Sequence, residues 1–87
     1  NSVDRYKNGI IARLRQQCPF LKESDITFIS LLYAGFSAKV ICFFLEMGNK
    51  NFYAKRSRLT ERIRESAAKD KEEFIESMNQ KSRRSDD

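Results

Sequence analysis

Apolar residues recur at helical spacing along the chain, and Pro or Gly residues mark where each apolar segment ends. The first segment covers residues 3–17 and stops before Pro19, because proline cannot continue a regular helix. A second begins at Ser24, a favourable helix-capping residue, and ends at Gly35, which tolerates a left-handed backbone. The apolar positions of the first segment are Val3, Tyr6, Ile10, Ile11 and Leu14.

The third apolar segment starts at Ser37, the expected cap of a helix that runs to about residue 47 and stops at Gly48. Its apolar residues occupy almost every side of the helix, so we expect neighbouring elements to cover it on both sides. The expected core-facing stripe is Val40, Ile41, Phe44 and Leu45, with Cys42, Phe43 and Met47 around it.

A fourth helix is predicted over residues 50–65, with Asn49 as its cap, and a fifth from Asp70 onward. Asp70 and Glu73 have the spacing of a reciprocal capping pair at the start of that last helix. Its narrow apolar face consists of Phe74, Ile75 and Met78.

The pattern contains no alternation of period two, which indicates an all-α fold: a small bundle of four to five helices containing a helix-turn-helix. We divide the chain into a connector helix over residues 1–19, a helix-turn-helix domain over 20–80, and a disordered polar tail over 81–87. Whether the first helix belongs to this domain or to an upstream module stays open at this stage.

The positive charge of the chain is concentrated in two segments. The net charge is +5, and by segment it is +4 over residues 1–22, −2 over 23–49, +5 over 50–64, −2 over 65–81 and zero beyond. Such a distribution favours an anionic partner such as nucleic acid. The basic segment 50–64 directly follows the most apolar helix, with only a Gly-containing turn between them.

On a helical projection, the segment 50–65 has an inward face of Phe52, Arg56, Leu59 and Ile63. The opposite face has small residues, Ala54 and Ser57, at its centre and long basic or aromatic side chains at its edges. A helix of this shape can enter the major groove of DNA while lysine and arginine reach the phosphates on either side.

The region 21–63 resembles the LuxR-type (GerE-like) helix-turn-helix domain of bacterial transcription regulators. The residues that match the family pattern are Gly35, Ser37, Lys39, Ile41, Leu45, Phe52, Arg58, Leu59 and Ile63. The resemblance is strongest to a divergent branch in which this domain ends larger, sensor-like regulators, and Lys71, Glu72, Glu73 and Phe74 match an acidic helix that follows there.

This resemblance implies that the helix after Gly48 is the recognition helix for double-stranded DNA, and that the partners include an upstream sensor domain and a second copy of the chain. Base-contacting positions fall on Tyr53, Ala54 and Ser57. Phosphate-contacting positions fall on Lys39, Lys50, Asn51, Lys55 and Arg58, and dimerisation positions on Phe74, Ile75 and Met78.

Several residues depart from the family pattern, among them Val40 where the pattern has Glu and Cys42 where it has Ala. Gly48 replaces the usual cap serine, and Glu61 places a negative charge on the outer face, where it would repel phosphate. Arg56 occupies an inward position that is typically apolar. We expect its side chain either to run along the first helix or to pair with Glu23 or Asp25.

Other functions remain as alternatives of lower weight. The main alternative is a helix-turn-helix-like protein interaction or dimerisation module that does not bind DNA, for which exposure of Phe20, Phe43 or Met47 would be evidence. A membrane-surface role ranks third. The chain has no His and no Gly-rich phosphate loop, so we predict neither an enzyme nor a cofactor, metal or small-molecule substrate.

The two cysteines, Cys18 and Cys42, lack metal-binding spacing and are interpreted as small buried residues in a reducing compartment. No apolar run is long enough to span a bilayer, and no signal peptide is evident. We therefore expect a cytoplasmic domain, in a full-length protein that could be tethered to a membrane.

Overall fold

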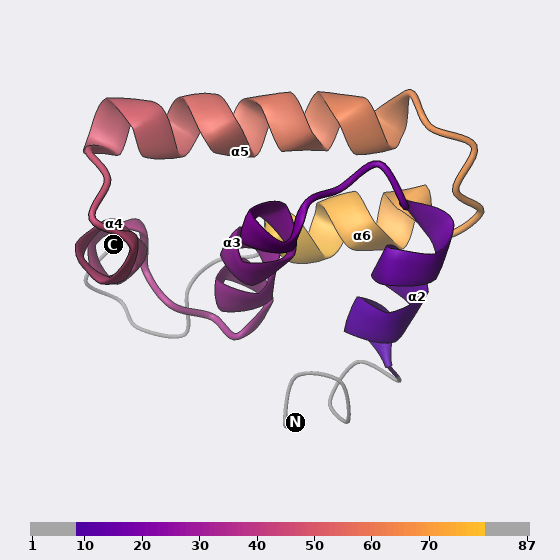
Figure 1. The fold of residues 1–87 in the computed structure, drawn as a ribbon, viewed down its shortest axis with the longest axis horizontal. Helices are drawn as coiled ribbons and strands as arrows, with labels where there is room; N and C mark the ends of the chain where they lie inside the picture. Colours follow the sequence, from indigo (N-terminus) through magenta and orange to yellow (C-terminus); the bar gives the residue numbers. More distant parts are fainter. Residues whose placement is uncertain (1–8, 80–87) are drawn as a thin grey trace.

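The computed structural model describes residues 9–79, and these residues form five helices and no strand. The predicted all-α fold is therefore confirmed. In Figure 1, α5 runs along one side of the molecule, α4 and α2 lie at opposite ends beneath it, and α3 and α6 lie between them. The helices are α2 (Ile10–Gln17), α3 (Glu23–Tyr33), α4 (Ala38–Leu45), α5 (Asn49–Arg64) and α6 (Lys71–Met78).

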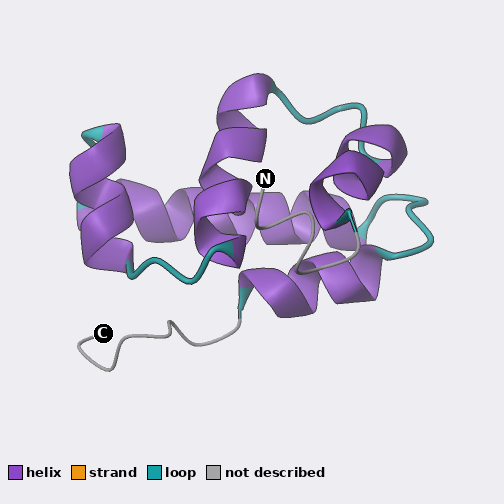
Figure 2. Ribbon diagram, turned by 90° about the horizontal axis from the view of Figure 1, so that it is seen from below, coloured by secondary structure: helices purple, strands orange, loops and turns teal. Residues whose placement is uncertain are grey.

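All five helices contribute to one hydrophobic core. α6 packs against both α5 and α3, while α4 packs against α5 and α3. Seen from below in Figure 2, α5 extends behind the other helices, and short loops connect consecutive elements. The largest fully buried side chains are Tyr33, Phe28, Phe52, Phe74, Ile10, Leu14, Ile29, Ile41, Leu59, Ile63, Met78 and Cys18.

Helix α2 belongs to this core. Ile10 and Leu14 are fully buried, and Ile11 is nearly so. The proposed boundary after residue 19 therefore has no counterpart in the packing, because α2 and the helices that follow it share one apolar interior. The expected beginning of this helix at Val3 and the expected tail over 81–87 lie outside the described residues.

The start of α3 differs from the prediction. Its cap is Lys22, and Ser24 lies inside the helix. The carboxylate of Asp25 accepts a hydrogen bond from the backbone N–H of Lys22 at 3.1 Å, so Asp25 gives this backbone N–H at the start of the helix a hydrogen-bond partner. The predicted stop is confirmed at the other end, where Gly35 has a φ of 90°.

Helix α4 begins as predicted but ends earlier. The hydroxyl of Ser37 accepts a hydrogen bond from the N–H of Val40 at 3.3 Å. The helix stops at Leu45 instead of continuing to residue 47, because Glu46 adopts the left-handed conformation with a φ of 56°. Gly48, the expected stop, is instead the extended residue that caps α5.

The turn between α4 and α5 thus consists of residues 46–48, a length typical of helix-turn-helix motifs. Asn49, the expected cap of α5, is the first residue of that helix. Its side-chain oxygen instead accepts a hydrogen bond from the thiol of Cys42 at 3.4 Å, which ties the start of α5 to α4.

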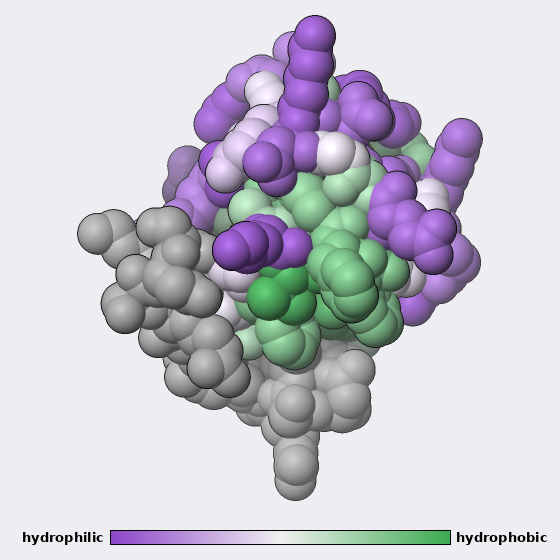
Figure 3. Space-filling model, turned by 90° about the vertical axis from the view of Figure 1, so that its left-hand side faces the viewer, coloured by the Kyte–Doolittle hydropathy of each residue, from purple (hydrophilic) through white to green (hydrophobic). Residues whose placement is uncertain are grey.

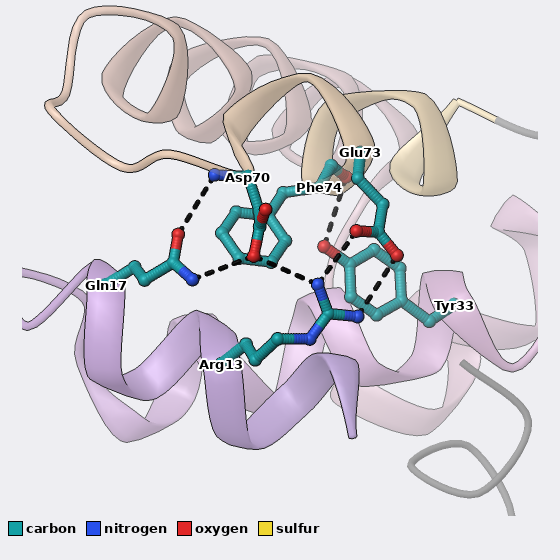
Figure 4. A network of polar contacts seen from close by, with 6 residues as sticks. All are labelled: Arg13, Gln17, Tyr33, Asp70, Glu73 and Phe74. Atoms are coloured by element: carbon teal, nitrogen blue, oxygen red, sulfur yellow. Dashed lines mark hydrogen bonds and ion pairs between the residues drawn. The ribbon is translucent and has the colours of Figure 1, made fainter. Parts of the chain in front are cut away.

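Arg13 connects α2 to α6 through charged hydrogen bonds (Figure 4). Its Nη1 lies 3.0 Å from Oδ2 of Asp70 and 2.8 Å from Oε1 of Glu73, and its Nη2 lies 3.1 Å from Oε2 of Glu73. Gln17 donates to Asp70 at 2.8 Å and accepts from the Asp70 backbone N–H at 3.0 Å. The predicted reciprocal capping pair is wrong, because Asp70 makes no side-chain cap and both carboxylates bind Arg13.

The same region holds a buried tyrosine. The hydroxyl of Tyr33 donates a hydrogen bond to the backbone carbonyl of Phe74 at 3.1 Å, which joins α3 to α6 (Figure 4). Burial raises the pKa of the Tyr33 phenol, so the group stays protonated and remains a donor at all ordinary pH values.

Both cysteine thiols are free and buried, as predicted. Burial raises the pKa of the Cys18 thiol, and a hydrogen bond with Ser66 offsets part of that rise. Over residues 9–79, no helix combines the length and the apolar character needed to cross a bilayer.

We predict that Leu14→Ala lowers the free energy of unfolding by about 2–5 kcal/mol, because it removes a fully buried side chain shared by α2 and the rest of the core. Urea denaturation followed by far-UV circular dichroism measures this. Gln16→Ala, an exposed change on the same helix, serves as the control and should alter stability by less than about 0.5 kcal/mol. A separately folding α2 would leave the main transition of the Leu14→Ala variant at its original midpoint.

Candidate nucleic-acid interface

Helix α5 has one buried face and one exposed face. Phe52, Leu59 and Ile63 are almost completely buried, which confirms three of the four predicted inward positions. The ring of Phe52 packs against that of Phe28 in α3, with centroids 5.3 Å apart. This contact holds the opposite side of α5 toward solvent.

The three residues predicted to contact bases lie on that exposed side. Ala54 and Ser57 are exposed, and their small side chains would allow close approach of another molecule. Tyr53 is 50% exposed, and its ring meets that of Phe52 edge-on at a centroid distance of 4.9 Å. The backbone of α5 therefore presents Tyr53, Ala54 and Ser57 together on one surface.

Arg56 does not make the contacts expected from the sequence. Its guanidinium carbon lies 5.4 Å from the ring centroid of Tyr53 and 6.0 Å from that of Phe52. Both distances suit a cation–π interaction. The inward position thus accommodates a charge because two aromatic rings line the path of the side chain.

The acidic residues expected to pair with Arg56 have other partners. Glu23 forms an ion pair with Arg15, and Asp25 forms one with Lys55. The predicted pairing of Arg56 with Glu23 or Asp25 is therefore wrong.

Lys55 is the predicted phosphate contact that the structure places differently. Its Nζ lies 3.2 Å from Oδ1 of Asp25, and its side chain is only 19% exposed. The same ammonium lies 5.7 Å from the ring centroid of Phe28. Lys55 therefore fastens α5 to α3 and points its charge into the protein rather than toward a ligand.

The pKa of Asp25 reflects this position. Burial by itself would raise the pKa of the carboxyl group, but the hydrogen bonds from the Lys22 backbone and from the Lys55 ammonium outweigh it and lower the pKa below its ordinary value. Asp25 is therefore a carboxylate at neutral pH, and it stabilises both the start of α3 and the contact with α5.

The other predicted phosphate contacts are accessible. Lys50, Asn51 and Arg58 are exposed on α5, and Lys39 is exposed on α4. Two further cations of α5 are engaged locally, because Arg62 lies 5.0 Å over the ring of Phe20 and Arg64 pairs with Glu61. The Arg64 partner reduces the repulsion that Glu61 would exert on a phosphate.

The apolar stripe predicted for α4 is wrong in part. Of its four residues, Ile41 is buried and Leu45 half-buried, but Val40 is 41% exposed and Phe44 67%. Beside the stripe, Cys42 is buried and Phe43 is 86% exposed. The physical reason is that an eight-residue helix at the end of the molecule presents only one side to the core. Of the residues named as markers of an interaction surface, Phe43 is exposed, whereas Phe20 and Met47 are partly buried against the core.

An exposed apolar surface results, of which only Phe43 was expected from the sequence (Figure 3). In that view toward the α4 end of the molecule, apolar side chains gather below a polar region. We call the surface the α4 ridge. Its members are Phe36, Val40, Phe43 and Phe44. The signal in the sequence was the excess of apolar residues over what one side of a short helix can bury.

The predicted dimerisation residues are also placed differently. Phe74 and Met78 are completely buried within the core of the chain itself, and only Ile75 is partly accessible. The prediction that Phe74 and Met78 contact a second copy is wrong for this fold, because their side chains already pack against the other helices.

No protein-family model, no curated protein and no solved structure matches this chain. Among residues 9–79, no three His, Cys, Asp or Glu side chains come together as a possible metal site.

We predict that Asp25→Asn lowers the free energy of unfolding at pH 7 by about 1–2 kcal/mol, because the Lys55 ammonium loses its charged partner. Folding lowers the pKa of Asp25. The carboxylate therefore stabilises the folded state fully at pH values above the ordinary carboxyl pKa of about 4. This stabilisation is lost as the pH falls through the lowered pKa of the folded state. The difference between wild type and variant should therefore shrink in acid, as measured by urea denaturation at several pH values.

Glu23→Gln is the matched control, since it neutralises an exposed carboxylate two residues away and should change stability by less than about 1 kcal/mol. A difference between wild type and Asp25→Asn that stays constant down to pH values well below 4 would show that the charge of Asp25 is not the cause.

Proposed function

We propose that the chain is a DNA-binding domain of a bacterial transcription regulator, and that α5 reads the major groove. The observation that carries the proposal is the two-sided character of α5: one face is fixed in the core, and the other exposes small residues beside cations. A rigid helix whose exposed face has small residues at its centre and basic residues at its edges fits the width of the major groove and the negative charge of the phosphates beside it.

The local connection supports the same function. α4 and α5 are joined by the short turn over residues 46–48 and are linked further by the hydrogen bond between Cys42 and Asn49. In a helix-turn-helix protein, the first helix of such a pair crosses the DNA backbone while the second enters the groove. Lys39 on α4 and Lys50 at the start of α5 are both exposed, and they would meet phosphates in that arrangement.

The assignment to a LuxR-type regulator with an upstream sensor domain is part of this proposal and rests on the sequence resemblance. Within it, Tyr53, Ala54 and Ser57 contact bases, while Lys39, Lys50, Asn51 and Arg58 contact phosphates. Lys55 has a smaller role than the resemblance implies, because Asp25 holds its ammonium.

The decisive experiment is selection of bound duplexes from a random pool at low ionic strength. We expect enrichment of a defined sequence, and we expect that Tyr53→Ala or Ser57→Glu changes the bases selected, because both residues lie on the exposed surface of α5. Absence of salt-dependent binding to any duplex would refute the proposal.

A matched pair of variants tests the roles of the cations. Arg58→Ala should weaken binding to all duplexes similarly and lower the slope of log K against log salt by about one. Lys55→Ala should change that slope much less, because its ammonium already pairs with Asp25. Equal effects of the two changes would contradict the roles given to these cations.

A protein interaction module is the second candidate function, and one specific observation favours it. Phe43 and Phe44 are more than half exposed, which is unusual for aromatic side chains of a small domain. The two functions use largely different surfaces, since these aromatic residues lie on α4, while the residues proposed to contact DNA lie on α5 with the exception of Lys39.

A further inference from the structure

Three of the four exposed apolar residues of the α4 ridge follow helical spacing. Phe36 lies in the loop before α4, while Val40, Phe43 and Phe44 stand at positions i, i+3 and i+4 of α4 and share one side of the helix. Their exposed fractions are 44%, 41%, 86% and 67%. Anchors at this spacing are those that one helix offers to another helix or to a groove.

The size of the ridge limits what it can bind. A fully buried aromatic side chain covers about 150–250 Å², so these four partly exposed side chains present on the order of 450 Å² of surface. Two such ridges packed together would bury on the order of 900 Å², which corresponds to a weak, reversible interface rather than an obligate one.

The charges beside the ridge favour a second copy in one orientation. Lys39 lies in the first turn of α4, and Glu46 directly follows the last residue of the helix, so the two charges mark its opposite ends. Both are exposed, and neither forms an ion pair among residues 9–79.

A twofold axis that relates two antiparallel helices keeps corresponding sides together and exchanges their ends. Across such an axis, the end of α4 that carries Lys39 in one copy lies beside the end that carries Glu46 in the other, and this opposite-charge pairing occurs twice. Parallel packing would instead bring the two Lys39 ends together and the two Glu46 ends together, so that like charges would face each other.

We propose that the α4 ridge is a homodimer interface, in which two copies of the chain pack α4 against α4 in antiparallel orientation. Phe43, Phe44 and Val40 form the apolar centre, and the two symmetric pairs between Lys39 and Glu46 set the orientation. The proposal does not depend on DNA binding. It replaces the dimer contact first expected at Phe74 and Met78, which are buried.

The arrangement leaves α5 accessible. In Figure 1, α4 is seen end-on at one extremity and α5 runs along the top. Figure 3 looks at this extremity and shows apolar side chains facing outward, so a partner α4 would lie beyond it. The twofold axis would then be vertical in Figure 1, with the α5 helices of both copies on the same side of the dimer. The interface would leave the exposed face of α5 accessible and would engage only Lys39 among the residues proposed to contact DNA.

Sedimentation equilibrium of the full chain without DNA tests the proposal. We expect a reversible monomer–dimer equilibrium over about two decades of concentration, with a dissociation constant in the micromolar to millimolar range. Phe43→Ser should raise that constant at least about tenfold without unfolding the domain, because Phe43 is mostly exposed. Far-UV circular dichroism checks the fold of each variant.

Charge reversal tests the orientation. Lys39→Glu and Glu46→Lys each create two like-charge contacts and should each raise the dissociation constant about tenfold. The double reversal restores opposite charges and should bring the constant back to within about a factor of two. Lys69→Glu, an exposed change of equal charge far from α4 in the sequence, should have little effect.

Three outcomes would overturn the proposal. The chain could stay monomeric at every concentration, Phe43→Ser could leave the dissociation constant unchanged, or the double reversal could have a dissociation constant as high as those of the single variants. The first would assign the ridge to another partner, and the last would exclude antiparallel packing. None of these measurements involves DNA, so the proposal of a dimer and the proposal of DNA binding can be refuted independently of each other.

Discussion

The contact between the rings of Phe28 and Phe52 determines how α5 is oriented about its own axis. The two centroids are 5.3 Å apart, and Phe52 is almost completely buried. Once this side of α5 is fixed, the positions half a turn away face solvent, and these include Ala54 and Ser57. Lys55 reinforces the orientation, because its ammonium reaches Asp25 beside the same contact. A change in this packing would rotate the entire outer surface of the helix.

The sequence predicted the fold well where the signal was local. Helical spacing located all five described helices, and Ser37 and Gly35 act at the helix ends as expected. The inward residues Phe52, Leu59 and Ile63 could be predicted because the apolar residues of this long helix lie on one side, and that side faces the core.

Interactions between distant residues could not be predicted. The carboxylates of Asp70 and Glu73 had the spacing of a local cap, yet they bind Arg13, which lies 57 and 60 residues away in the sequence. Asp25 likewise had several possible cationic partners, and only the packing of α3 on α5 selected Lys55 over Arg56. A sequence pattern gives the kinds of groups that can pair, whereas the fold decides which of them are close.

Helix α4 shows a second limit. The spacing of apolar residues shows which sides of a helix are apolar, but it does not show which of these residues fill the core of their own chain and which stay exposed and available to a binding partner. An amphipathic helix buries a stripe somewhat over 100° wide, and in α4 Ile41, Cys42 and Leu45 already provide it. Phe43 and Phe44 lie beyond that stripe, and within residues 9–79 no further helix covers them. The abrupt change from apolar to basic sequence at Gly48 therefore separates two exposed surfaces of different chemistry, one aromatic and one cationic, which the same core holds at a fixed angle.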